Sequence, residues 1–130
     1  MCYGNMFNGC ISLTAAPELP ATNFAYGCYE YMFDGCTSLT AAPELPATNL
    51  EYGCYSNMFQ SCTSLTAAPE LPATNMNDEC YSYMFQSCWS LKRIKMNASS
   101  GSWGPGMFAH CSMLELVDMT GSTGVPTLSY

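Results

Sequence analysis

Cysteine is the residue type in this sequence with the most chemistry to offer. The 130-residue chain has nine cysteines, and they follow a period. Two series advance by 26 residues, namely Cys2, Cys28, Cys54 and Cys80, and Cys10, Cys36, Cys62 and Cys88. Because nine is an odd number, at least one cysteine has no intramolecular disulfide partner.

The spacing separates three kinds of cysteine chemistry. Zinc sites pair their ligands as C-x₂₋₄-C, and seven residues separate the two series within each unit here. Cysteines eight positions apart on a helix lie about 12 Å apart, which is too far for a disulfide. Equivalent cysteines of neighbouring units would lie about 5 Å apart, which a disulfide can span, although parallel Cβ vectors disfavour it. We therefore expect buried thiols that act as small apolar fillers, keep disulfides as an alternative, and expect no metal site.

His110 stands beside Cys111 and invites a nucleophile–base interpretation. Catalytic pairs are neighbours in space rather than in sequence. His110 also occupies the position that Gly35 and Ser61 hold in earlier units, so we interpret it as a loop residue. The sequence predicts no catalytic residue and no cofactor, and hence a protein that is not an enzyme.

The elements that must position these residues are internal repeats. The segment SLTAAPELPATN occurs unchanged at residues 12–23, 38–49 and 64–75, and a Met-Phe pair precedes each copy. The last step, from Cys88 to Cys111, is 23 residues. Repeats of this length stack as successive coils, each burying its apolar side against its neighbours. We predict one solenoid domain over residues 1–130, with about five units.

Each unit has two halves. The segment CYxxMFxxC places Cys, Met-Phe and Cys on one face of a short helix or 3₁₀ turn. The later units then carry L-x-x-I-x-M at 91–96 and L-x-x-V-x-M at 114–119, which is typical of the strand half of a leucine-rich repeat. The predicted fold class is an α/β repeat solenoid, with one short parallel β-strand plus a short helix or 3₁₀ turn per 23–26-residue unit.

The earlier units depart from that strand pattern. Glutamates fall where Met96 and Met119 would point inward, and buried charges are almost never left unpaired. We infer that a proline before each glutamate forces a bulge, which turns the glutamate outward and the following leucine inward. The three sets are Pro17, Glu18 and Leu19; Pro43, Glu44 and Leu45; and Pro69, Glu70 and Leu71.

Charge and hydropathy exclude several classes of partner. The net charge is −7, and all the cations lie together as Lys92, Arg93 and Lys95. Such a chain cannot neutralise a phosphate backbone, so we expect neither nucleic acid nor anionic membranes as partners. The sequence contains no apolar run of membrane-spanning length and shows no signal peptide. We interpret the chain as a fragment of a longer array, or as an array that associates end to end through uncapped ends.

The units CYEYMFDGCTSLTAAPELPATN and CYSNMFQSCTSLTAAPELPATN resemble the BspA-like leucine-rich repeats of bacterial surface proteins. Phe33, Gly35, Cys36 and Leu39 match the family pattern I-G-x-x-A-F-x-G-C-x-x-L, and the 23-residue step is the family's usual length. The resemblance implies a right-handed solenoid with a parallel sheet on its concave side. It also implies a cell-surface or secreted location and a role in adhesion or host-protein binding.

The concave sheet face is the default contact surface of such a solenoid. We expect it to carry Thr14, Thr40, Thr66, Glu18, Glu44, Glu70, Lys92, Arg93 and Lys95, with the cations closing the end of the acidic row. A further row, Tyr3, Tyr29, Tyr55 and Tyr81, either faces out of the convex side or packs against the next coil. The predicted function is a non-catalytic surface module that binds a protein or glycan. Alternatives are a structural spacer of a larger surface or phage-borne protein, and an accessory module of an enzyme outside this segment.

Overall fold

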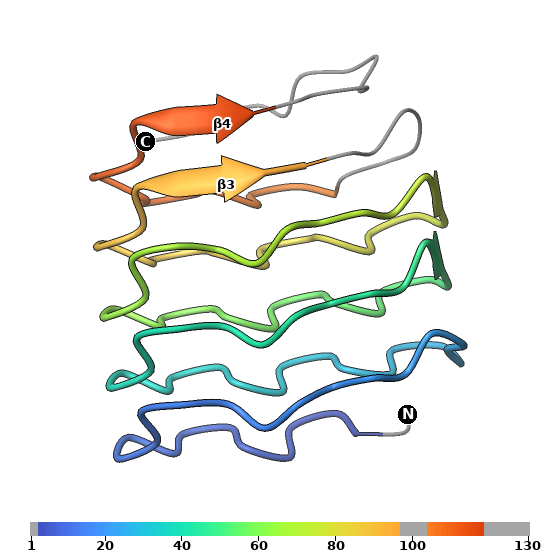
Figure 1. Cartoon of the computed structure of the whole chain (residues 1–130), viewed down its shortest axis with the longest axis horizontal. Helices are drawn as coiled ribbons and strands as arrows, with labels where there is room; N and C mark the ends of the chain where they lie inside the picture. Colours follow the sequence, from blue (N-terminus) through green and yellow to red (C-terminus); the bar gives the residue numbers. More distant parts are fainter. Residues whose placement is uncertain (1–2, 97–103, 119–130) are drawn as a thin grey trace.

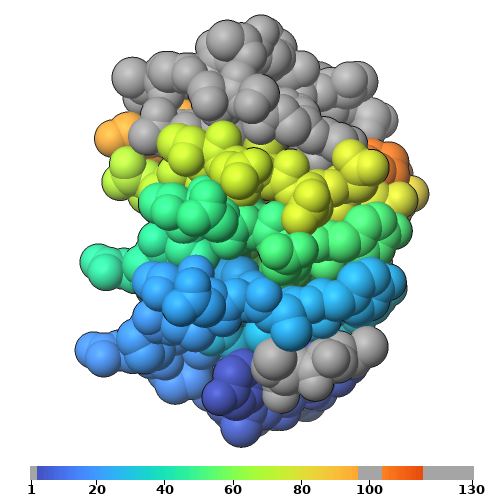
Figure 2. All heavy atoms as spheres, turned by 90° about the vertical axis from the view of Figure 1, so that its right-hand side faces the viewer, coloured from blue at the N-terminus to red at the C-terminus, as the bar shows by residue number. Residues whose placement is uncertain are grey.

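The chain folds into successive coils that stack on one another, as a computed structural model shows (Figure 1). The structure describes residues 3–96 and 104–118. Each coil has a turn leg, which is the CYxxMFxxC segment (28–36, 54–62 and 80–88), and a strand leg opposite it (39–47, 65–73 and 91–96). A space-filling view shows the coils as layers in sequence order (Figure 2). Cys2 and Met119, which the sequence patterns made candidates for the core, lie outside the described residues.

Parallel pairing joins the strand legs. In the later coils β3 (Arg93–Lys95) pairs with β4 (Leu116–Asp118), at the two places where the sequence predicts strands. The earlier coils contribute single parallel bridges in the same row, joining Ala15 to Ala41, Ala41 to Ala67 and Ala67 to Arg93. The expected strand per unit therefore forms fully only in the later coils. The earlier strands stop because a proline two residues later has no N–H to donate to the ladder.

Two further strands lie in the links between coils, where the sequence predicts none. The strands β1 (Asn49–Leu50) and β2 (Asn75–Met76) pair in parallel, with Asn49 opposite Asn75. Both leucine and methionine are buried, whereas both asparagines are exposed. The links are therefore part of the stack and carry a ladder of their own.

The predicted bulge is confirmed in the third coil. Ala67 lies opposite Arg93, whereas Leu71 lies opposite Met96. Between these two bridges the third strand leg advances by four residues, whereas the fourth advances by three. The third strand leg therefore contains one extra residue, which defines a β-bulge. Glu70 is exposed and Leu71 is fully buried. The extra residue restores the inward register for leucine after the proline.

The prediction of a helix or 3₁₀ turn in each unit is wrong for the described residues, which contain no helix. Alternate N–H groups of the turn leg donate to the next coil, as Phe33 does to the Met58 carbonyl oxygen (2.9 Å). The groups between them close turns within the coil, as Cys36 does to the Phe33 carbonyl oxygen (3.0 Å). Phe33 and Phe59 of adjacent coils lie only 5.5 Å apart. A helix is about 10–12 Å wide and could not stack at that distance.

The turn leg repeats every four residues. A left-handed residue recurs at Gly27, Tyr31 and Gly35, and the same spacing holds in the later coils at Gly53, Asn57 and Ser61 and at Glu79, Tyr83 and Ser87. Two consecutive side chains then face inward in each turn, so that the buried pattern in the second coil is Cys28-Tyr29, Met32-Phe33, Cys36.

The row of Tyr29, Tyr55 and Tyr81 is therefore buried, at most 3% exposed, and does not face outward. Successive rings stack at 6.1 Å. Packing against the next coil, the other interpretation that the sequence allows, is confirmed.

The core lies between the two legs and consists of columns of like residues. The phenylalanine rings of successive coils stack nearly parallel, with Phe59 5.5 Å from Phe33 and 5.6 Å from Phe85. Burial of each such ring contributes about 1.5–3 kcal/mol. Because a ring is covered mainly by the rings before and after it, each coil depends on its neighbours for stability.

Candidate functional site

The strand-side face is the surface formed by the nine residues that the sequence places there, and all nine are exposed: Thr14, Thr40, Thr66, Glu18, Glu44, Glu70, Lys92, Arg93 and Lys95. Backbone hydrogen bonds join the threonine row. The Thr40 N–H donates to the Thr14 carbonyl oxygen (3.3 Å), and the Lys92 N–H donates to that of Thr66 (3.0 Å). Lys92 therefore continues the threonine row in the fourth coil.

The acidic row ends in a cation, as the sequence suggests. Lys95 Nζ lies 3.2 Å from Glu70 Oε1. Both side chains are more than half exposed, so water screens the pair and it contributes about 0–1 kcal/mol. Glu18 and Glu44 have no ion-pair partner among the described residues. The face thus has an acidic part over the first coils and a mixed part over the later ones.

Grooves separate the PELP segments of successive coils. One, of about 510 Å³, lies between Pro43–Pro46 and Pro69–Pro72, and a neighbouring one, of about 560 Å³, lies between Pro17–Pro20 and Pro43–Pro46. Glutamates and proline rings line both grooves. Proline side chains are rigid, so these hollows keep their shape without a ligand.

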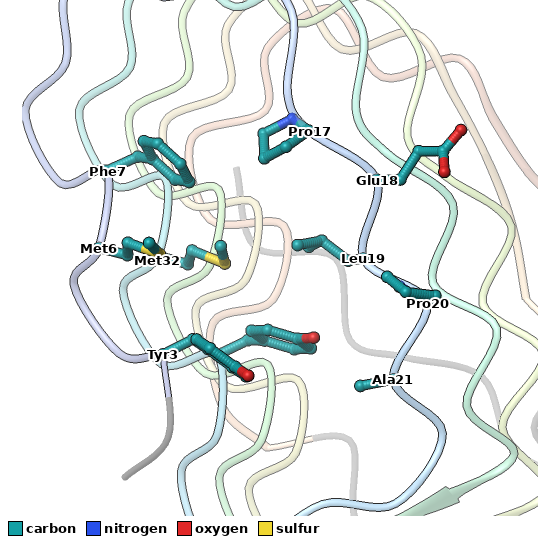
Figure 3. A pocket seen from close by; sticks show the side chains of 10 residues that line it. Tyr3, Met6, Phe7, Pro17, Glu18, Leu19, Pro20, Ala21 and Met32 are labelled. Atoms are coloured by element: carbon teal, nitrogen blue, oxygen red, sulfur yellow. The ribbon is translucent and has the colours of Figure 1, made fainter.

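The first coil has no coil before it among the described residues, and its interior is open (Figure 3). A cavity of about 490 Å³ lies between the legs and is lined by Met6, Phe7, Leu19 and Ala21, among others. Met6 is 61% exposed, whereas its equivalent Met58 is fully buried. Figure 3 also shows Glu18 pointing away from this cavity. The cavity is therefore an uncovered section of the core.

The buried cysteines are thiols, as expected, and they have a second role that the sequence did not suggest. Cys36, Cys62 and Cys88 each donate to the carbonyl oxygen of a phenylalanine in the preceding coil, at 3.1, 3.2 and 3.0 Å. Cys111 does the same across the shorter step, at 3.0 Å. The thiol thus fills a small apolar space and gives the carbonyl oxygen a second hydrogen bond, beside the one that this oxygen accepts from a backbone N–H of its own coil. The recurring offset between Cys and the phenylalanine of the previous unit, 29 residues for Cys36, Cys62 and Cys88 and 26 for Cys111, is the sequence signal for this contact.

Burial keeps these thiols protonated. Desolvation is the largest cause that raises the pKa of Cys54 and Cys111 to about 11 and that of Cys80 to about 12. It also raises the pKa of Cys62 and Cys88. Since the thiolate is the nucleophile and the metal ligand, these cysteines are chemically inert at neutral pH. In the described segments no group of His, Cys, Asp and Glu side chains is arranged to hold a metal ion.

His110 is exposed at a left-handed position (φ 62°), equivalent to Gly35 (φ 73°) and Ser61 (φ 58°). The Cys111 thiol beside it points to the Phe85 carbonyl oxygen. A buried donor thiol with a raised pKa is not a nucleophile, so the interpretation of His110 as a loop residue is consistent with the geometry.

The part of the chain that the structure describes contains no helix that could cross a bilayer. No curated protein and no solved structure matches the chain. Residues 3–115 match the family described as BspA type leucine rich repeat region, in six copies, compared with the roughly five units counted from the sequence repeats. That match covers most of the chain and agrees with the coils, the short parallel strands and the columned core. The chain belongs to the BspA-type leucine-rich repeat family.

Proposed function

We propose that this chain is a non-catalytic binding module of a cell-surface protein, and that it recognises a protein partner through the strand-side face. The observation that carries the proposal is the repeated presentation of the same polar groups in register. Thr, Glu and Pro recur on three successive coils at about 5 Å spacing, and all of the threonines and glutamates are exposed. Solvated side chains in fixed rows offer a partner several identical contacts at once.

Charge selects the kind of partner. Glu18 and Glu44 are exposed and not ion-paired, while the cations Lys92 and Arg93 lie at the far end of the same face. A protein surface with basic side chains over the first coils and an acidic group over the fourth is complementary to this face. A neutral glycan carries no charges to complement the acidic and basic parts of this face. A protein is therefore the better fit for this face.

The chemistry of the thiols supports a non-catalytic role. Six buried cysteines with raised pKa values are poor nucleophiles. A binding role uses only the exposed rows. A spacer role, in contrast, requires no specific contact on this face.

The test uses a library of random 12-residue peptides displayed on phage and selected on the 130-residue chain. We expect enriched peptides to be rich in Lys and Arg and to bind the Glu18→Gln/Glu44→Gln variant at least tenfold more weakly. The matched control is Glu51→Gln/Asp78→Asn, which makes the same change of net charge at two exposed carboxylates away from the strand-side face and should leave binding unchanged. Equal losses of peptide affinity in both variants would mean that net charge, and not the strand-side face, determines binding. Failure to enrich any sequence would favour the spacer.

We further propose that the open first coil lets chains associate end to end. Exposed Met6 and the apolar cavity beside it have the shape of a surface that another coil covers. Sedimentation velocity of the 130-residue chain should show association that Met6→Lys abolishes. Ile11→Lys alters an equally exposed side chain that does not line the cavity, and should leave association intact. A chain that stays monomeric at millimolar concentration refutes this proposal.

A further inference from the structure

A polar groove lies on the outer side of the turn legs, away from the strand-side face. This turn-side groove has a volume of about 590 Å³, within the range of small-ligand sites. It crosses three successive coils and is lined by Glu30, Tyr31, Asp34, Ser56, Asn57, Gln60, Glu79, Ser82, Tyr83 and Gln86. The lining contains no Lys, Arg or His, and its only large apolar surfaces are the two tyrosine rings.

The floor of the groove consists of paired amides and hydroxyls. Gln60 Nε2 donates to Gln86 Oε1 (2.9 Å), and Asn57 Nδ2 donates to Ser56 Oγ (2.8 Å). Each pair uses only part of the hydrogen-bonding capacity of an amide. The Gln86 amide hydrogens and the Gln60 carbonyl oxygen remain for groups outside the protein. A neighbouring donor and acceptor match the hydroxyl groups of a polyol, each of which both donates and accepts.

The two tyrosines occupy backbone positions that do not suit them. The equivalent residues of successive coils are Asn5, Tyr31, Asn57, Tyr83 and Gly106, and all have positive φ. Asn and Gly adopt this conformation at low cost, whereas a bulky aromatic residue does not. Strained residues of this kind cluster at ligand sites.

Tyr83 is held as well as strained. Its ring lies against Gly106, where an added Cβ would collide with the ring atoms. The side chain nevertheless remains 38% exposed. Tyr31, two coils away and about 10 Å along the stack, is half-buried at the other end of the groove. Between them lies Asn57, so each ring borders a space that no aromatic side chain fills.

Carboxylates lie at both ends of the groove. Glu79 lies beside the Tyr52 hydroxyl, and Asp34 lies at the opposite end beside Asn8. With Glu30, these carboxylates make the groove electronegative and repel sulfate, phosphate and uronic acid groups. Carboxylate oxygens also accept hydrogen bonds from hydroxyl groups, so they suit a ligand that is rich in hydroxyls and carries no negative charge.

We propose that the turn-side groove binds a neutral oligosaccharide. Tyr31 and Tyr83 stack on the apolar faces of the sugar rings, the amides of Gln60 and Gln86 bind hydroxyl groups between them, and Glu79 accepts from a hydroxyl at the edge. This site is independent of the strand-side face. A basic peptide is the competing occupant, but neutral amides, hydroxyls and tyrosines outnumber carboxylates in the lining.

The first experiment measures binding of cellotetraose, maltotetraose and mannotetraose to the 130-residue chain by isothermal titration calorimetry. We expect saturable binding of at least one of them, and at least tenfold weaker binding of a sulfated heparin tetrasaccharide. In ¹⁵N–¹H spectra the side-chain amides of Gln60 and Gln86 should shift on titration. No binding of any neutral tetrasaccharide overturns the proposal, as does tighter binding of tetralysine or a shift confined to the strand-side face.

The second experiment uses the residue type that the same backbone position carries in other coils. Tyr31→Asn and Tyr83→Asn remove a ring and relieve the strained conformation. Each should lower saccharide affinity roughly three- to tenfold, while the melting temperature stays the same or rises. Trp89→Asn removes an aromatic ring that is 57% exposed and does not line the groove, and it should leave the saccharide affinity unchanged. Parent-like affinity in both tyrosine variants refutes the assignment.

Discussion

Replacement of the central ring of the phenylalanine column, Phe59→Ala, tests whether each coil is stabilised by its neighbours. Phe59 is fully buried and stacks on Phe33 at 5.5 Å and on Phe85 at 5.6 Å. Truncation of a buried phenylalanine to alanine costs about 3–5 kcal/mol, because the transfer free energy is lost and a cavity remains. We expect Phe59→Ala to lower the free energy of unfolding by about that amount.

The matched control is the same substitution at the first ring of the column. Phe7 is only partly buried and has one described stacking partner, Phe33 at 5.5 Å. Part of its surface already meets solvent in the parent chain, so Phe7→Ala should cost about 1–2 kcal/mol. A second control, Phe59→Leu, keeps most of the buried volume and should cost less than Phe59→Ala.

Urea titrations followed by circular dichroism measure these differences. The midpoint and the slope together give the free energy of unfolding, and an unchanged slope shows that the same surface is exposed in each variant. Equal losses at Phe7 and Phe59 would refute the argument, since they would mean that burial by neighbouring coils does not set the stability of the column. A loss below about 1 kcal/mol at Phe59 would refute it as well.

Three further outcomes follow from the geometry. Thiols in the unfolded chain ionise near pH 9, whereas the pKa of the folded Cys54 and Cys111 thiols is about 11. The folded state therefore holds more protons than the unfolded state between pH 9 and 11. The free energy of unfolding should be constant with respect to these thiols below pH 9 and should fall above it, by up to about 1.4 kcal/mol per pH unit per thiol. Urea midpoints at pH 8 and pH 10.5 measure this loss, and the Cys54→Ala/Cys111→Ala variant should depend less on pH than the parent chain. Gly106→Ala should lower the melting temperature more than Gly53→Ala, because both positions have positive φ but only at the former would the added Cβ meet a tyrosine ring; equal effects would contradict the packing. Lys95→Gln should change the free energy of unfolding by less than about 1 kcal/mol, since its ion pair is exposed, and a larger loss in a urea titration would show that the pair is coupled to the core.

Repetition of the sequence determines much of this architecture. Residues that recur every 26 positions must occupy equivalent places in successive coils, so columns of Cys, Met and Phe and an exposed row of glutamates could be predicted. The outward direction of Glu70 also followed from the sequence. A charged residue at an inward position is too costly, and a proline beside it provides the extra residue that shifts the register.

The exposure of the strand-side residues could be predicted for the same reason. All nine are exposed, and Lys95 meets Glu70. The groove between Tyr31 and Tyr83 could not, because its residues come from three coils and the non-helical turn legs bring them to one side. Gly or Asn at some of the left-handed positions, as at Gly27, Gly53 and Asn57, was the available signal.

The conformation of the turn leg was decided by the tertiary structure alone. A period of four residues is close to the 3.6 of a helix, and local propensity does not separate the two. The alternate N–H groups of the turn leg find their acceptors 25 residues away, as Tyr29 does at the Cys54 carbonyl oxygen (2.9 Å). Those acceptors exist only once the next coil is in place, and a helix would be too wide to let that coil approach. The stacking of coils also turns the tyrosines inward and brings carbonyl groups within reach of thiols such as those of Cys36, Cys62 and Cys88.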